Sequence, residues 1–304
     1  MAAASKPKPD PRMVGVLNVD KPAGMTSHDV VYHIRRAARV KQVGHAGTLD
    51  PDATGVLLVC VGPATRIAEY LADQGKAYRA VIQLGSETDT EDASGQVLSQ
   101  TDASHITRED LEKLLPDFMG EISQIPPMVS AVHHEGKRLY ELARAGITVE
   151  REARTIRIDS LAMSDFAPGP NATAILDVEC GKGTYIRTLC ADIGKALGVG
   201  GHMASLRRTA VGAFHADSAA PLETITPENV LSLLTPASEA LRSFPMQSVD
   251  DARRADILHG RTVPTELADT PIVRVVDANQ QLVALALAEA GALRPFKVFS
   301  TEHS

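Results

Sequence analysis

The sequence of 304 residues contains no tryptophan, and aromatic residues make up only 4% of it. Since hydrophobic residues still reach 44%, valine, isoleucine, leucine and alanine must supply most of the core. No apolar run approaches the ~20 residues that span a bilayer. Residues 1–12 are polar and proline-rich, without the apolar segment of a secretory signal. These absences predict a cytoplasmic protein with an aliphatic core and no membrane contact.

Cysteine is also scarce. The chain has three cysteines, an odd number, at the widely separated positions Cys60, Cys180 and Cys190. Each is set among apolar residues, which is typical of free buried thiols in a reducing compartment. Because no cysteine or histidine pair has the spacing of a zinc ligand set, the sequence predicts neither a disulfide nor a bound metal.

Positive charge is in short supply as well, because the formal net charge is −7. Such a balance argues against a nucleic-acid partner until its distribution is considered. Residues 84–117 hold nine acidic and two basic side chains, whereas residues 1–60 hold eight basic and five acidic ones. Further basic side chains cluster at residues 136–138 and 207–208. The acidic excess is therefore local, and a phosphate-binding face elsewhere is compatible with the sequence.

Strands and helices are interspersed along the chain without a regular βαβ repeat, which predicts an α+β fold and not a doubly wound sheet. Apolar patterns predict strands over residues 14–19, 56–61, 76–84, 155–164, 172–180, 272–276, 282–288 and 297–299. Helical spacing predicts helices capped by Ser27 and over residues 64–72, 108–115, 184–197, 227–234 and 250–259. Residues 125–152 indicate an excursion from the core, with a short helix over residues 139–145, and residues 244–304 indicate a small, mostly β module.

The stretch of residues 43–55 stands out, because it joins a short loop to the apolar run of residues 56–61. It combines three glycines, Pro51 and His45 with the carboxylate of Asp50. Glycine permits close backbone approach, and a proline restricts both itself and the residue before it. The loop would therefore hold Asp50 in a fixed direction beside a rigid strand. Two interpretations stay open: a tight turn that Asp50 merely caps, and an active-site loop that presents it.

Few other residues offer chemistry that could accompany Asp50. Tyr185 and Arg187 follow the turn at residues 181–183, two positions apart, and both could be aimed into one cleft. An arginine beside Asp50 would keep the carboxylate ionised and oriented, because an adjacent cation lowers its pKa. Tyr78 and Tyr185 are flat enough to stack on a nucleobase. From the residues alone, a core or surface position is the commoner expectation for each of them.

Other catalytic arrangements have weaker support. The segment of residues 181–184, Gly-Lys-Gly-Thr, lacks the earlier glycine of a phosphate-binding loop. Asp50 and Asp52 could form the carboxylate pair of a glycosidase, but neighbours in a proline-containing loop should point apart. The histidine pair at residues 133–134 lies in charged, loop-like sequence and is expected at the surface.

Five motifs occur in order along the chain: residues 21–27 (KPAGMTS), 44–55 (GHAGTLDPDATG), 76–78 (KAY), 181–187 (GKGTYIR) and 206–208 (LRR). Together they resemble the TruB family of tRNA pseudouridine-55 synthases. The resemblance covers residues from about 14 to 215, and the motif around Asp50 is long and highly specific. Residues 52–54 and the segment 125–152 match the bacterial form better than the guide-dependent archaeal and eukaryotic relatives.

The resemblance implies the pseudouridine synthase fold, a mixed and largely antiparallel central sheet flanked by helices. It assigns residues 14–240 to the catalytic domain and residues 125–152 to an RNA-binding thumb inserted in that domain. Residues 244–304 occupy the place of a small, mostly β PUA-like domain. Residues 1–13 form an N-terminal extension that matches no part of the family.

The resemblance also implies an activity, the isomerisation of uridine 55 in the T loop of tRNA to pseudouridine. The target base would be flipped out, at a cost of about a few kcal/mol, and Asp50 would act as the nucleophile. By motif position, Tyr78 would stack on the uracil, Arg187 would pair with Asp50, and His45 would contact the RNA where the base is extruded. The rest of the pocket would be lined by Tyr185 and Leu206.

Isomerisation transfers no electrons and loses no atom, so the resemblance implies no cofactor and no metal. It implies tRNA as the partner, gripped at the T arm and elbow by a monomer that needs no other protein and contacts no membrane. A secondary role in tRNA folding fits the thumb and the terminal module. Two other classes stay open: a tRNA-binding or folding protein whose chemistry is secondary, and a glycosidase-type hydrolase that uses Asp50 and Asp52.

Overall fold

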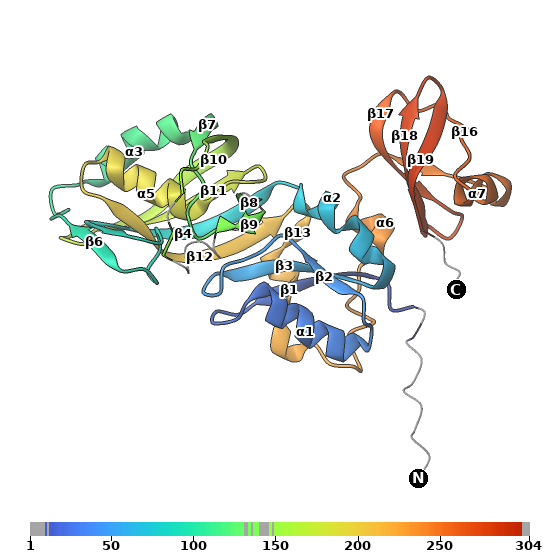
Figure 1. The fold of residues 1–304 in the computed structure, drawn as a ribbon, viewed down its shortest axis with the longest axis horizontal. Coiled ribbons are helices and arrows are strands. Elements are labelled where there is room, and N and C mark those ends of the chain that lie inside the picture. The colour runs from blue at the N-terminus through green and yellow to red at the C-terminus, as the bar shows by residue number, and fades with distance from the viewer. Residues whose placement is uncertain are drawn as a thin grey trace, which may run out of the picture.

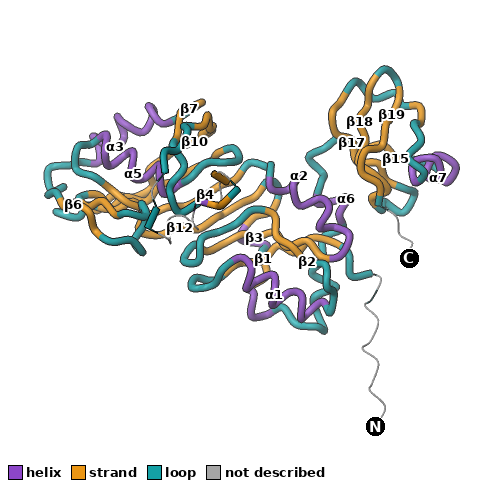
Figure 2. Tube along the Cα trace, viewed as in Figure 1, coloured by secondary structure: helices purple, strands orange, loops and turns teal. Residues whose placement is uncertain are grey.

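The computed structural model describes residues 10, 12–130, 133, 134, 136–139, 146, 147 and 149–299. Most of the expected N-terminal extension therefore lies outside the described residues, as does nearly all of the helix expected over residues 139–145. Helices and strands alternate irregularly along the rest of the chain (Figure 1, Figure 2). None of the described helices combines the length and the apolar character that crossing a bilayer requires.

One large sheet dominates the structure. In spatial order its main strands are β14 (Ala220–Pro221), β1 (Gly15–Lys21), β3 (Thr54–Val61), β12 (Gly201–Val211), β4 (Lys76–Leu84), β11 (Thr173–Cys180), β10 (Arg154–Ala167) and β7 (Gly120–Gln124). Two further strands pair at its side, β2 (Val43–Ala46) with β3 and β13 (Phe214–His215) with β12. Among these described strands only the pairs β1–β14 and β3–β12 are parallel. The sheet confirms the predicted α+β class and its mixed, largely antiparallel order.

The centre of the sheet is buried on both faces, which explains the unbroken apolar run of β3. Leu57 and Val59 belong to the core that α1 (Ser27–Ala38) and α5 (Ile186–Ala196) cover. Val56 and Leu58 belong to a second cluster, which includes Leu71 of α2 (Ala68–Ala72). All four strand residues are fully buried. The strand is thus a rigid support for the loop that precedes it.

Helix α1 confirms a predicted helix but begins one residue earlier than expected. The Thr26 hydroxyl accepts from the Asp29 amide at 3.2 Å, and the Asp29 carboxylate accepts from the Thr26 amide at 2.9 Å. This reciprocal pair is a capping box, so Ser27 is not the N-cap. The Ser27 hydroxyl contacts the Asp50 loop instead, as described below. The basic residues of this segment are exposed, namely Arg35, Arg36, Arg39 and Lys41.

Two stretches differ from the elements that the sequence predicts. Residues 201–211 form β12, a central strand, where the sequence predicts no element. Residues 227–234 form turns and not a helix. The Asn229 side chain accepts from the Thr226 amide at 2.8 Å and donates to the Thr224 carbonyl at 2.8 Å. These side-chain bonds compete with the backbone bonds of a helix, and a short helix, α6 (Ala237–Ala240), forms later.

The remaining elements of this part of the chain are short. The helix expected over residues 64–72 is a 3₁₀ turn, η1 (Gly62–Ile67), followed by α2. The others are β5 (Ser86–Thr88), β6 (Val97–Gln100), α3 (Arg108–Leu114), η2 (Leu115–Phe118), β8 (His133–His134), β9 (Lys137–Arg138), η3 (Ala216–Ser218) and η4 (Leu222–Thr224).

The C-terminal module is a separate small sheet, drawn in orange and red in Figure 1. Its order is β15 (Met246–Ser248), β17 (Thr270–Val276), β18 (Leu282–Glu289), β19 (Ala292–Val298) and β16 (Val263–Pro264), with α7 (Asp251–Leu258) beside it. This mostly β architecture confirms the predicted PUA-like module. Leu285 and Phe299 of the module share a hydrophobic cluster with Ile67 and Leu71 of the larger domain, so the two parts are packed together and not loosely tethered.

Candidate active site

Asp50 lies on the loop that connects β2 to β3. Because these strands pair antiparallel, the chain must reverse direction within a few residues. The Ala53 amide donates to the Asp50 carbonyl at 3.2 Å, and the Gly24 amide donates to the Pro51 carbonyl at 3.0 Å. The Asp50 side chain keeps 39% of its surface exposed. The loop is therefore both a tight turn and a support that presents a carboxylate.

Gly55 marks where this loop meets its neighbour in the sheet. Its φ is +98°, and an added Cβ would lie 2.1 Å from the carbonyl oxygen of Arg208. A side chain here would have to displace β12, since the contact is to backbone. Glycine is thus required both for its conformation and for the close approach of the two strands.

Two side chains from the motif of residues 21–27, Lys21 and Ser27, hold the backbone of the Asp50 loop. Lys21 is fully buried, and its ammonium donates to the carbonyls of Pro22, Pro51 and Ala53 at 2.9, 2.8 and 2.7 Å. Burial lowers the pKa of Lys21 to about 8. The Ser27 hydroxyl accepts from the Leu49 amide at 3.0 Å. These bonds fix the backbone on both sides of Asp50.

Arg208 holds the same loop from the sheet. Its side chain is fully buried, and its guanidinium donates to the carbonyls of Val56, Gly47 and Thr48 at 2.7, 3.2 and 3.4 Å. Its neighbour Arg207 pairs with Asp20 at 2.8 Å. Arg208 is therefore a structural cation and not part of an exposed phosphate-binding cluster, which corrects that expectation for residues 207–208.

The structure brings Asp50 and Arg187 together, as the sequence predicts. Arg187 lies in the first turn of α5; its Nε is 3.0 Å from Asp50 Oδ2, and its Nη2 donates to Asp50 Oδ1 at 3.4 Å. The Arg187 side chain is only 5% exposed. A buried guanidinium that meets both carboxylate oxygens fixes their orientation, which a single ammonium would not do.

Arg187 has further partners that the sequence did not indicate. Asp92 Oδ2 lies 3.7 Å from its Nε, and the Thr90 carbonyl accepts from its Nη1 at 3.3 Å. The Val129 carbonyl accepts from its Nη2 at 2.8 Å. Asp92 belongs to the acidic stretch of residues 84–117, nearly a hundred residues from α5. Its signal was a carboxylate within a Thr- and Gly-containing turn, which is too common to single out.

The pKa of Asp50 moves opposite to the sequence-based expectation. Burial raises the pKa of Asp50 above its ordinary value, and the charge of Arg187 opposes that rise. The nearby charge of Asp92 raises the pKa of Asp50 further. Burial is the largest of these effects. Asp50 is thus an oriented carboxylate that holds its proton more tightly than a free aspartate.

Of the other predicted residues, Tyr78 interacts electrostatically with Asp50 and His45 with Arg208. Tyr78 on β4 is directly across from Arg208 on β12; burial raises its pKa, and the charge of Asp50 adds to that rise. His45 on β2 is half-buried, and burial together with the charges of His28 and Arg208 lowers its pKa to about 4. His45 is therefore a neutral ring at physiological pH, edge-on to the ring of His28 at 5.4 Å.

Tyr185 and Leu206 have no described bond to Asp50. Tyr185 is half-buried directly before α5, where its amide donates to the Gln124 side chain at 2.8 Å and its carbonyl accepts from that side chain at 3.1 Å. Leu206 is a partly buried residue of β12 that packs against the core. Asp52 is exposed. Among the described residues no three of histidine, cysteine, aspartate and glutamate lie together as metal ligands would.

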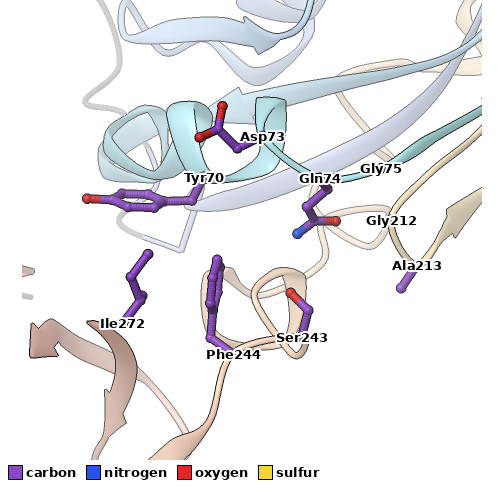
Figure 3. Close-up of a pocket in the computed structure, with 9 residues that line it drawn as sticks. All are labelled: Tyr70, Asp73, Gln74, Gly75, Gly212, Ala213, Ser243, Phe244 and Ile272. Carbon is purple, nitrogen blue, oxygen red and sulfur yellow. The ribbon is translucent and has the colours of Figure 1, made fainter. Parts of the chain in front are cut away.

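A cavity of about 490 Å³ lies elsewhere, between the large domain and the C-terminal module (Figure 3). Figure 3 shows Tyr70 and Gln74 on one side of it and Phe244 and Ile272 on the other. None of its lining residues is one of the predicted site residues. The cavity belongs to the junction of the two parts and not to the Asp50 site.

Comparison with known proteins agrees with this architecture. Residues 35–186 match the family model described as "TruB family pseudouridylate synthase (N terminal domain)", and residues 187–249 match "tRNA pseudouridylate synthase B C-terminal domain". The "tRNA pseudouridine synthase B" of Symbiobacterium thermophilum is 53% identical over 81% of this chain and 82% of its own. That of Bacillus cereus is 44% identical over 94% of this chain and 97% of its own.

The fold has solved counterparts as well. A chain in the "Crystal Structure of a Cbf5-Nop10-Gar1 Complex" covers 95% of this chain and 86% of its own length at a TM-score of 0.74 and 28% identity. The mixed sheet and the matched family models define the chain as a pseudouridylate synthase. Within that class the chain belongs to the TruB family.

Proposed function

We propose that this protein isomerises uridine 55 in the T loop of tRNA to pseudouridine, with Asp50 as the nucleophile. The observation that carries the proposal is the Asp50–Arg187 pair, in which a buried guanidinium holds a solvent-accessible carboxylate at 3.0 Å. Relatives that span nearly the whole chain are named tRNA pseudouridine synthase B. Their name supports tRNA as the substrate and isomerisation as the reaction.

The reaction breaks the N1–C1′ bond of uridine, turns the uracil and forms a C5–C1′ bond. The proton on C5 is lost and N1 gains a proton, so atoms and charge balance without oxidation or reduction. Ionised Asp50 would begin the reaction by attacking the nucleotide. Its raised pKa makes it a stronger base and nucleophile than a free aspartate, while Arg187 keeps it aimed.

The target base must leave the T loop before it can reach Asp50. Extruding a base costs about a few kcal/mol, and stacking on an aromatic ring returns roughly 1–3 kcal/mol. We assign that stacking to Tyr78, which lies within the electrostatic reach of Asp50. We assign the contact to the extruded strand to His45, because a neutral ring suits an unstacked base. The pocket would be completed by Tyr185 and Leu206.

We propose a separate role for each part of the chain. Residues 14–240 would catalyse, residues 125–152 would grip the T arm as a thumb, and residues 244–304 would contact the rest of the tRNA elbow. We propose that the enzyme acts in the cytoplasm as a monomer without a protein partner. Sedimentation of the enzyme with and without tRNA tests this, since a second enzyme copy per tRNA would contradict it.

The test is tritium release from a T-arm RNA labelled at C5 of uridine 55 alone. The wild type should release the label, and Asp50→Asn should release none while binding the RNA normally. The matched control is Asp52→Asn, which neutralises an exposed carboxylate two residues away and should keep the activity. An RNA labelled at its other uridines should release nothing. Equal release by Asp50→Asn would remove the catalytic assignment, and free uracil among the products would indicate a hydrolase.

A further inference from the structure

The loop of residues 88–95 supplies two of the partners of Arg187, and its own anchoring therefore bears on Asp50. The Thr90 carbonyl and the Asp92 carboxylate both face the guanidinium, at 3.3 and 3.7 Å. Asp92 is also held within the loop, where Thr90 Oγ1 donates to its Oδ1 at 2.7 Å. Whatever fixes this loop against α5 thus fixes the groups around Arg187.

Glu91 lies between these two residues and points at the same helix. Its carboxylate Oε2 accepts from the hydroxyl of Thr188 at 2.5 Å. Thr188 directly follows Arg187 on α5 and is 5% exposed. Two adjacent residues of the helix therefore hold three adjacent residues of the loop. The bond between Glu91 and Thr188 uses no atom of Arg187 or of Asp50.

The backbone of Glu91 shows that its side chain is not incidental. Its φ is +63°, a left-handed conformation that favours glycine or asparagine over a long side chain. The backbone around it is bonded to β12, because the Met203 amide donates to the Glu91 carbonyl and the Ala93 amide to the Met203 carbonyl, both at 3.0 Å. A glycine would fit this turn with less strain but would lose the bond to Thr188.

We infer that Glu91 and Thr188 form a latch that positions Thr90 and Asp92 around Arg187, and so keeps Asp50 aimed. Glu91 is a positioning residue in this inference, which rests on the proposed function. It has no described bond to Asp50 and acts only through its neighbours. Its expected effect is on the rate of the chemical step and not on the affinity for tRNA.

Charge alone is the competing explanation. Glu91 is a mostly buried carboxylate whose pKa is raised by burial and by Asp192, and lowered by Thr188, Arg187 and Arg151. Its negative charge could act on Arg187 directly. Glu91→Gln distinguishes the latch from the charge explanation, because the amide oxygen still accepts from Thr188 while the charge is removed. Changes at Thr188 leave the charge of Glu91 in place: Thr188→Ser keeps the hydroxyl that donates to Glu91, and Thr188→Val removes it.

Single-turnover tritium release and tRNA binding are measured for each variant. Glu91→Gly and Thr188→Val should slow release about tenfold, the effect of one hydrogen bond to a charged group. Their tRNA dissociation constants should stay within roughly twofold of wild type. Glu91→Gln and Thr188→Ser should restore most of the rate. The double variant that combines Glu91→Gly with Thr188→Val should be no slower than the slower of these two single variants, because both changes remove the same hydrogen bond.

The matched control is Ala290→Gly, which replaces another residue of positive φ, +50°, on the surface of the C-terminal module. It should leave the rate unchanged. Hydrogen–deuterium exchange of residues 88–95 gives a second readout, which should rise in Thr188→Val although the sequence of the loop is intact.

Wild-type turnover by Thr188→Val would overturn the latch, and so would exchange in residues 88–95 that equals wild type. A rate for Glu91→Gln as low as that of Glu91→Gly would replace it with the charge explanation. If the wild type releases no tritium, the proposed function fails, while the exchange measurement still decides whether the latch exists.

Discussion

Replacing Arg187 by lysine tests whether geometry or only positive charge is needed beside Asp50. The guanidinium reaches four acceptors: both oxygens of Asp50, the Thr90 carbonyl at 3.3 Å and the Val129 carbonyl at 2.8 Å. A lysine keeps the charge but offers one nitrogen in place of three. The lysine nitrogen can approach Asp50 only by losing the hydrogen bonds to the carbonyls of Thr90 and Val129.

The magnitude follows from those lost bonds. Each hydrogen bond to a neutral carbonyl contributes about 0.5–1.5 kcal/mol, and one to a charged group about 1.5–3 kcal/mol. Loss of two or three of them from the oriented state corresponds to about 2–4 kcal/mol, or roughly 30- to 1,000-fold in the chemical step. Because the Arg187 side chain is only 5% exposed, it is not free to bind phosphate, and the affinity for tRNA should change little.

The assay is single-turnover tritium release, with the tRNA dissociation constant measured separately. Arg79→Lys is the matched control, because Arg79 meets Asp177 in a similar two-oxygen pair at 2.8 and 3.3 Å on the exposed surface of the same sheet. That variant should turn over like the wild type, since exposed pairs contribute little. An Arg187→Lys enzyme within about threefold of the wild-type rate would refute the argument that the fork geometry is required.

Three other changes give distinct expected outcomes. Gly55→Ala should destabilise the fold by about 2–4 kcal/mol in urea unfolding, because its Cβ would lie 2.1 Å from the Arg208 carbonyl; Gly183→Ala, at φ +84° with open space around it, should cost only about 1 kcal/mol, and equal losses would contradict the contact argument. Lys21→Met should lower the release rate about tenfold or more, because three carbonyls lose their donor, and an unchanged rate would show that the loop needs no clamp. Asp92→Asn should move the acidic limb of the pH–rate profile to lower pH: the rate falls as Asp50 takes up a proton, burial and the charge of Asp92 both raise the pKa of Asp50, and removing that charge stabilises the ionised form. A limb that moves to higher pH would contradict this.

Local sequence patterns predict much of the fold. The apolar run of β3, the alternation of β4 and the helical spacing of α1 each predict the observed element, because each face of these segments keeps the same environment, core or solvent, along its length. The error at the start of α1 is equally local. Thr26 and Ser27 are both good caps, and only the reciprocal bond with Asp29 decides between them.

The features that the sequence does not predict depend on contacts between distant segments. No strand is predicted at β12, because its centre carries Arg207 and Arg208, which are polar but satisfied by Asp20 and by loop carbonyls. A strand whose buried positions are charged has no hydrophobic period to detect. The same holds for Asp92, whose importance depends on meeting Arg187 across nearly a hundred residues. The family motifs contain Asp50, Arg187 and the residues that hold the Asp50 loop, but not Thr90, Asp92 and Val129, which contact Arg187.

Three buried cations explain how an acidic protein builds this site. Lys21 and Arg208 direct their donors at backbone carbonyls of the loop, so they brace the loop without neutralising Asp50. Arg187 alone meets the carboxylate, and it is shared with Asp92 and two carbonyls. A buried cation needs such partners to offset its desolvation. Because they are mostly neutral carbonyls, the loop is rigid while the pKa of Asp50 stays raised, which suits the nucleophilic role proposed for Asp50.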